Sequence, residues 1–195
     1  DLELIRRHLG ELLEGRKVAI PFYNFKTGRR EGVSQEMQLG EREIILIDSL
    51  HGLFEGMTGD VPEAKKFKLY IETLSQLKGR DGRFIRWADV RMLRRMVRDM
   101  QFRSYNPRQT IAHWHYVRRS ELRYIVARSK EASAIVNSFL PYELPIMKNR
   151  LADCFPEFVE EFKGDVERED AYERAVRVSE IFDQIPAWTD ESVVG

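Results

Sequence analysis

Four consecutive aliphatic residues, Ile-Ile-Leu-Ile, occupy positions 44–47 and end on Asp48. Such an unbroken run is typical of a strand that is covered on both faces, as in a parallel sheet flanked by helices. Two further strand-like runs follow at 67–71 and 134–137, and two long helical patterns lie between them. Strands that alternate with long helices predict an α/β domain.

The helical patterns are marked by apolar residues at intervals of three and four. This spacing predicts an opening helix over residues 2–13 and two central helices at 87–102 and 107–129. Pro107 suits the first turn of the second central helix, and Asn106 suits its N-cap. From residue 140 onward the pattern is again helical.

Charge is balanced over the whole chain but uneven along it. Thirty-two basic residues match thirty-two acidic residues, which excludes a wholly cationic coat for nucleic acid or membranes. Residues 83–128 hold twelve arginines against three acids, and residues 155–195 hold twelve acids against four basic residues. Two interpretations stay open: oppositely charged helical faces that pack together, or an arginine surface that grips phosphate through its planar guanidinium groups.

Cysteine usage and hydropathy bear on the compartment. Cys154 is the single cysteine, so it forms no internal disulfide, which is common in a reducing cytosol. The longest apolar runs are too short to span a bilayer. We therefore expect a cytoplasmic protein without a membrane partner.

An extended run over 18–25 leads into a segment that could hold a planar ligand. Tyr23 and Phe25 alternate, so they point to the same side of a strand, with Arg30 nearby. These side chains could sandwich a base and bind a polar group. The alternative is a strand that uses both aromatic rings for packing.

Acidic and basic side chains elsewhere suit phosphate chemistry. Asp48 ends the aliphatic run, where a carboxylate could hold Mg²⁺ at the carboxyl edge of a sheet, and His51 follows it. Arg95, Arg98 and Asp99 fall within one helical turn. The arginines could stabilise a polyphosphate, although Asp48 could also begin an ordinary turn and the arginines could form surface ion pairs of small energy.

Taken in order, these segments resemble the uridine kinase and phosphoribulokinase family of P-loop kinases, in particular a bacterial uridine kinase-like subgroup. The resemblance covers about residues 1–148. The family motif P-x-Y-D-F-x-x-H-x-R is matched by Pro21, Tyr23, Asn24, Phe25, Gly28 and Arg30. The lid motif R-R-x-x-R-D-x-x-x-R is matched by Arg94, Arg95, Arg98, Asp99 and Arg103. A Glu-Gly that ends a family strand corresponds to Asp48-Ser49.

The resemblance implies a P-loop NTPase-like α/β fold, with a parallel sheet flanked by helices and a helical C-terminal extension. Residues 1–150 would form the acceptor-binding and lid part, and residues 151–195 the extension packed on it. The phosphate loop G-x-x-x-x-G-K-[ST] does not occur in the sequence. In the family this loop and the general-base aspartate lie upstream, so we expect that the amino-terminal part is absent and that this segment alone is inactive.

The resemblance also implies ATP-dependent phosphoryl transfer to the hydroxyl of a nucleoside, with ATP and Mg²⁺ as cofactors. The implied acceptor-binding residues are Tyr23, Asn24, Phe25, Arg30 and His51. The implied catalytic residues are Asp48, Arg95, Arg98 and Arg103, with Asp48 near Mg²⁺, directly or through water. The implied triphosphate-binding residues are Arg94, Arg98 and Arg103.

Two departures from the family pattern leave alternatives open. Gly28 stands where uridine kinases carry the histidine that reads the pyrimidine, and Asn24 replaces an aspartate. The alternatives are a degenerate kinase-fold domain that binds a nucleotide or a partner without turnover, and a phosphoribulokinase-like sugar kinase. Nucleic-acid binding ranks last because the tail is acidic. The amphipathic tail helices could close over the sheet or over a second copy in a homo-oligomer.

Overall fold

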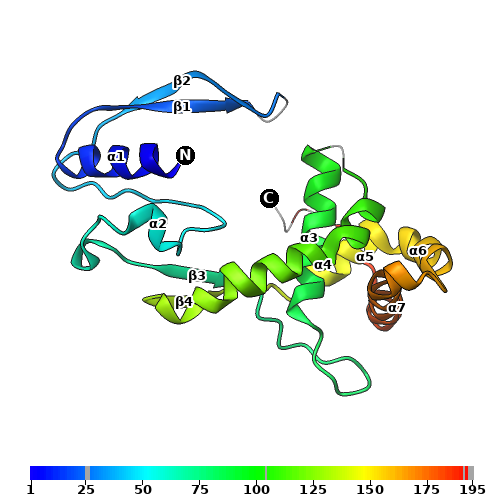
Figure 1. Ribbon diagram of the computed structural model, residues 1–195. Helices are drawn as coiled ribbons and strands as arrows, with labels where there is room; N and C mark the ends of the chain where they lie inside the picture. Colours follow the sequence, from blue (N-terminus) through cyan, green and yellow to red (C-terminus); the bar gives the residue numbers. More distant parts are fainter. Residues whose placement is uncertain (25–26, 104, 191, 193–195) are drawn as a thin grey trace. The chain divides into compact units, whose positions relative to one another are not determined.

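The computed structural model describes residues 1–24, 27–103, 105–190 and 192. The chain forms two compact units (Figure 1). The first unit consists of Asp1–Leu69 and Tyr124–Ala134, and the second of Tyr70–Arg123 and Ile135–Gly195. The domain boundary expected near residue 150 stays a prediction.

The first unit combines a helix with a β-hairpin. Its elements are α1 (Leu2–Leu13), β1 (Val18–Asn24), β2 (Arg29–Met37), α2 (Glu55–Thr58) and the 3₁₀ helices η1 (Glu63–Lys65) and η2 (Val126–Glu131). The Asp1 carboxylate caps α1 by accepting from the Leu4 amide at 3.0 Å, and Leu9 and Leu12 are buried. The α1 helix packs against α2 and β1, and Arg6 of α1 donates to Asp60 at 2.6 Å. The expected opening helix is therefore confirmed.

The hairpin pairs β1 and β2 in antiparallel register, from Val18 opposite Met37 to Asn24 opposite Arg29. The register shifts on both sides of Pro21, which has no amide hydrogen to give to the ladder. The turn contains Gly28 at φ +68°, a conformation that glycine adopts readily. The sequence predicted β1 but not β2, because the side chains of β2 are mostly polar and exposed.

The strand expected at 44–48 does not form, and this expectation was wrong. The backbone there is irregular, and the side chains of Ile44 and Leu46 are 88% and 85% exposed. An aliphatic run becomes a buried strand only when neighbouring elements pair with it and cover its faces.

The second unit contains a small sheet and a bundle of helices. Its elements are β3 (Leu69–Glu72), α3 (Trp87–Phe102), α4 (Pro107–Tyr124), β4 (Ala134–Asn137), α5 (Glu143–Leu151), η3 (Ala152–Cys154), α6 (Phe155–Phe162), η4 (Val166–Arg168) and α7 (Glu169–Gln184). One terminal residue each of β3, α4 and β4 is counted with the first unit. The expected helix at 87–102 and strand at 134–137 are confirmed. The helix expected at 107–129 ends at Tyr124, and the Asn106 side chain caps it by accepting from the Gln109 amide at 2.8 Å.

The two strands of the second sheet are parallel. The Ala134 amide donates to the Lys68 carbonyl at 3.2 Å, and the Ser138 amide donates to the Glu72 carbonyl at 2.8 Å. The residue numbers of the partners thus rise together along both strands. Helices flank this sheet (Figure 1), so the α/β class is confirmed.

The hydrophobic core of the second unit joins α3, α4, α5, α6 and α7. Leu93 and Met96 of α3 are fully buried in it, as are Phe155 and Phe162 of α6. The ring of Phe155 meets that of Phe182 edge to face, with centroids 5.4 Å apart, which is a favourable arrangement for aromatic pairs. In the described ranges, no helix has the length and hydropathy needed to cross a membrane.

Candidate active site

The acceptor segment lies at the turn of the β1–β2 hairpin, in the first unit. Tyr23 faces Arg30 across the ladder. Asn24 accepts from the Thr27 amide at 3.3 Å and donates its own side-chain amide to Glu31 at 3.0 Å. Phe25, another predicted acceptor residue of this motif, lies outside the described residues.

Glu31 is a member of this turn that sequence reasoning missed. Its carboxylate accepts from the Thr27 hydroxyl at 2.6 Å and from the Asn24 amide. These hydrogen bonds, that of Thr27 first, hold the pKa of Glu31 below its ordinary value. The turn thus places the exposed residue Glu31 next to the half-exposed Tyr23. The Tyr23 hydroxyl lies 4.0 Å from the position that a Cβ on Gly28 would take.

Asp48 and His51 lie in the exposed, irregular segment between β2 and α2. The His51 carbonyl accepts from the Phe54 amide at 2.8 Å. Among the described residues, no three His, Cys, Asp or Glu side chains gather as a metal site would require. The roles of Asp48 near Mg²⁺ and of His51 near the acceptor stay predictions.

Three of the predicted lid arginines gather around Asp99 at the end of α3. The Asp99 side chain is 2% exposed and lies 3.1 Å from Arg95 Nε, 3.0 Å from Arg98 Nε and 3.5 Å from Arg103 Nη1. The arginine side chains are 35%, 50% and 54% exposed. Positions 95, 99 and 103 are each four residues apart, so helix geometry brings them together. One carboxylate thus holds three guanidinium groups, which leaves positive charge in excess at the surface.

Arg94 has different partners from these three arginines. Its Nε donates to Glu143 of α5 at 2.6 Å, and its Nη1 donates to the Ser138 hydroxyl at 3.3 Å. These bonds tie α3 to the end of β4 and the start of α5. A contact between Arg94 and a triphosphate stays a prediction.

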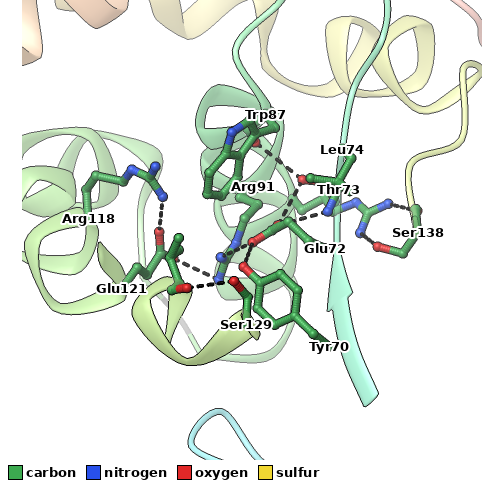
Figure 2. Close-up of polar contacts among 12 residues, drawn as sticks. Tyr70, Glu72, Thr73, Leu74, Trp87, Arg91, Arg118, Glu121, Ser129 and Ser138 are labelled. Atoms are coloured by element: carbon green, nitrogen blue, oxygen red, sulfur yellow. Dashed lines mark hydrogen bonds and ion pairs between the residues drawn. The ribbon is translucent and has the colours of Figure 1, made fainter. Parts of the chain in front are cut away.

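A buried polar network that sequence reasoning missed lies around Arg91, near the start of α3 (Figure 2). Arg91 donates from Nη1 to Glu72 of β3 and contacts Glu121 of α4 through Nη2, both at 2.8 Å. Arg118 of α4 approaches Glu121 at 3.2 Å and stacks 4.1 Å over the ring of Trp87. Both Glu72 and Glu121 are buried. The sequence gives no signal for the pairs that they form with Arg91, because the partners are far apart in the chain.

Glu72 also shapes the chemistry of a neighbouring phenol. The Tyr70 hydroxyl donates to Glu72 at 3.1 Å. Burial, followed by the charge of Glu72, raises the pKa of Tyr70 to about 12. Tyr70 therefore stays a hydrogen-bond donor at physiological pH.

Ion pairs also connect the basic central helices with the acidic tail. Arg108 of α4 donates from Nε to Glu161 of α6 at 2.7 Å, and Arg177 of α7 donates to Asp89 of α3 at 2.7 Å. The Arg108–Glu161 pair has the signs that packing of oppositely charged helices predicts, whereas the Arg177–Asp89 pair joins the same two segments with the charges reversed. The charge of Arg108 is thus neutralised by Glu161. The cluster around Asp99 keeps an excess of positive charge, because three arginines share one carboxylate.

Exposed guanidinium groups such as those around Asp99 have a planar donor geometry that suits phosphate oxygens. The model of the phosphoribulokinase / uridine kinase family matches residues 1–143. The chain belongs to this family.

Curated relatives of the chain, at low sequence identity, carry names that match this family. The chain is 25% identical to a uridine kinase of Brevibacillus brevis over 137 residues, which is 70% of this chain and 56% of the relative. Uridine kinases of Deinococcus deserti and Clostridium tetani are 25% and 28% identical over the same share of this chain, and 58% and 57% of their lengths are covered. The chain thus spans little more than half the length of these relatives. No solved structure matches it significantly.

Proposed function

We propose that this chain provides the acceptor-binding and lid parts of an ATP-dependent kinase that phosphorylates the hydroxyl of a nucleoside. The observation that carries the proposal is the cluster of Arg95, Arg98 and Arg103 around Asp99. Membership of the phosphoribulokinase / uridine kinase family supports the reaction type. The curated relatives named uridine kinase support a nucleoside as the acceptor.

The geometry of the cluster fits a triphosphate. Asp99 accepts from Nε of Arg95 and is approached by both Nε and Nη2 of Arg98, each at 3.0 Å. The side chains of Arg95 and Arg98 are 35% and 50% exposed, so further N–H groups would be available for phosphate oxygens. Phosphoryl transfer depends mainly on positioning and on stabilising charge that spreads over the phosphoryl oxygens. Arg95, Arg98 and Arg103 would provide that stabilisation and help to exclude water when the lid closes.

The cofactors would be ATP and Mg²⁺. When bound, ATP supplies the phosphoryl group and Mg²⁺ offsets the charge of its phosphates. Mg²⁺ commonly uses only one or two protein carboxylates together with phosphate and water, so the single exposed carboxylate of Asp48 fits this role. Arg94 would reach the triphosphate only by exchanging its bonds to Glu143 and Ser138.

The acceptor would bind at the hairpin turn. The exposed ring of Tyr23 offers a stacking surface, and Asn24 shapes the turn through its bonds to Thr27 and Glu31. Arg30, which pairs with Asp1 at 2.8 Å, offers donors for the sugar or the base. Gly28 removes the imidazole of the family pattern, so the acceptor need not be a pyrimidine nucleoside.

A coupled assay of ADP release tests the proposal. The full-length protein, in which the upstream phosphate loop is expected, is screened with MgATP against uridine, cytidine, adenosine, guanosine and ribulose 5-phosphate. We expect turnover with one nucleoside and a loss of at least about tenfold for Arg98→Ala. Arg108→Ala is the matched control, because Arg108 pairs with Glu161 outside the cluster, and it should keep the wild-type rate.

The outcomes separate the candidate functions. Turnover with ribulose 5-phosphate alone would favour the phosphoribulokinase-like alternative. Nucleotide binding that depends on Arg98, without turnover in any mixture, would favour a degenerate kinase-fold domain. Turnover that is unaffected by Arg98→Ala would remove this arginine from the site.

A further inference from the structure

A groove lies in the second unit between the loop that precedes α3 and one face of α7. The loop folds back on itself as a hairpin, in which Lys78 pairs with Phe84. The Arg80 amide donates to the Gln184 side chain of α7 at 2.6 Å, which ties the hairpin to the helix. Gly79 permits this close approach, because a Cβ there would lie 3.1 Å from the Gln184 side-chain oxygen. The groove has a volume of about 380 Å³, within the range of roughly 300–1,000 Å³ that is usual for small-molecule sites.

Part of the groove is apolar. Ile85 of the hairpin and Ile181 of α7 line it and are buried, and Val176 of α7 lines it and is half-buried. Phe84 also lines it and is 61% exposed, with the Lys78 ammonium 4.9 Å from the ring centroid. An apolar group that contacts Phe84 and Val176 would therefore leave water, which favours its binding.

Some charged residues of the groove are already paired within the protein. Arg177 of α7 binds Asp89 of α3 through two bonds of 2.7 and 2.9 Å. Asp81 of the hairpin accepts from the Arg83 amide at 3.0 Å, and its other oxygen lies 3.7 Å from Arg83 Nε. The charges of these pairs are thus offset before any ligand arrives.

Three further charged side chains of the groove, Arg86, Glu173 and Glu180, form no hydrogen bond or ion pair with any residue that the structure describes. Glu173 and Glu180 lie four positions before and three positions after Arg177, so the three project from one side of α7. The bond to Asp89, followed by the negative charges of Asp89, Glu173 and Glu180, raises the pKa of Arg177 against the effect of burial. Arg86 precedes Asp89 by three positions at the start of α3. The free positive charge and the two free carboxylates therefore lie on either side of the same Arg177–Asp89 pair.

We propose that this groove binds a small zwitterion, namely an α-amino acid with a large apolar side chain. The ammonium group of the ligand would bind to the carboxylates of Glu173 and Glu180. Its carboxylate would bind to the planar guanidinium of Arg86, and its side chain would cover Phe84 and Val176. A ligand of one sign alone would leave free charges of the other sign unpaired. The groove shares no residue with the arginine cluster of the candidate active site, so this proposal does not depend on the proposed kinase function.

The first experiment measures binding of L-phenylalanine, L-leucine and L-tryptophan to the chain by calorimetry and by NMR. The tightest of the three is then compared with its analogues that lack one charge, which for phenylalanine are phenethylamine and 3-phenylpropionate. We expect the amino acid to bind at least about tenfold more tightly than either analogue. Its amide shift changes should concentrate in residues 79–86 and 172–184. The proposal fails if none of the amino acids binds, if an analogue binds equally well, if the shift changes lie elsewhere, or if uridine binds more tightly.

The second experiment removes the free charges one sign at a time. Arg86→Gln should lower the affinity at least about fivefold, as should Glu173→Gln combined with Glu180→Gln. Arg80→Gln and Asp183→Asn are the matched controls, because Arg80 lies on the same hairpin and Asp183 on the same helix, and neither lines the groove. All five residues are exposed, so the variants should keep the wild-type circular dichroism spectrum.

The controls should change the affinity less than twofold. A loss in Arg80→Gln or Asp183→Asn as large as in the groove variants would assign the effect to overall charge and overturn the proposal. An inactive kinase assay would leave the outcome of these binding measurements unchanged.

Discussion

Helices α3 to α7 of the second unit close around one apolar core, whereas the described part of the first unit buries only a few apolar side chains, namely Leu9, Leu12, Val18 and Met57. Val90, Met96 and Phe162 are completely buried in the second unit. In the first unit Ile44 and Leu46 are exposed, and the hairpin is held mainly by its own ladder. Packed core and proposed ligand contacts are therefore distributed unequally between the two units. The arginine cluster is built on a packed helix, and the acceptor turn is built on a hairpin with little core beneath it.

The largest expected difference concerns truncation of apolar side chains. Phe155→Ala should lower the free energy of unfolding by about 3–5 kcal/mol, because it opens a cavity in the core. Leu46→Ala should change it by less than about 0.5 kcal/mol, because the side chain is already in water. Urea unfolding followed by circular dichroism measures both, and equal losses would contradict the comparison.

Local unfolding, measured by amide hydrogen exchange, should also differ between the two units. Backbone amides in the middle of α3, around Val90 to Met96, should exchange at least about a hundredfold more slowly than amides of the β1–β2 hairpin, because they open only with the packed core. Amide exchange followed by NMR or mass spectrometry tests this. Similar protection in both places would show that the hairpin is as firmly held as the helices.

Alkaline pH should act on the second unit through Tyr70. Its pKa is raised to about 12, so the folded state favours the neutral phenol. The stabilisation is complete below the ordinary pKa near 10 and is lost as pH rises through 12, by up to about 2 kcal/mol. Absorbance at 295 nm should show one tyrosine that ionises late, and Tyr70→Phe should remove this late step while the other tyrosines titrate as before.

The smallest effect is expected in the first unit, at acidic pH. Hydrogen bonds from Thr27 and Asn24 lower the pKa of Glu31, so the folded turn favours the carboxylate. The stabilisation that these bonds give the turn is complete above the ordinary pKa of glutamate. It is lost as pH falls through the lowered pKa of Glu31. A ¹³C titration of the glutamate side chains should identify Glu31 as an early-ionising group, and Thr27→Val should bring its pKa back toward the ordinary value.

Helices were predictable from the sequence because their signals are local. The α3 bounds follow from apolar spacing, and the start of α4 follows from Asn106 and Pro107. The gathering of Arg95 and Arg103 on Asp99 follows from intervals of four residues. All of these depend on neighbours within one or two turns.

Features that depend on distant partners were not predictable. The run at 44–47 has the composition of a buried strand, but composition does not specify which elements cover it. Arg91 meets Glu72 and Glu121, which are 19 and 30 positions away in sequence. Arg94 likewise pairs with Glu143, which lies 49 positions further along the chain.

The exposed run at 44–47 also bears on how the chain behaves in concentrated solution. Short, uncharged aliphatic segments of high β-propensity tend to pair between molecules and to seed aggregates. Here Glu41, Arg42 and Glu43 precede the run and Asp48 follows it, the arrangement of charged gatekeepers that discourages such pairing. Replacing these flanking charges would therefore be expected to lower solubility before it changes the fold.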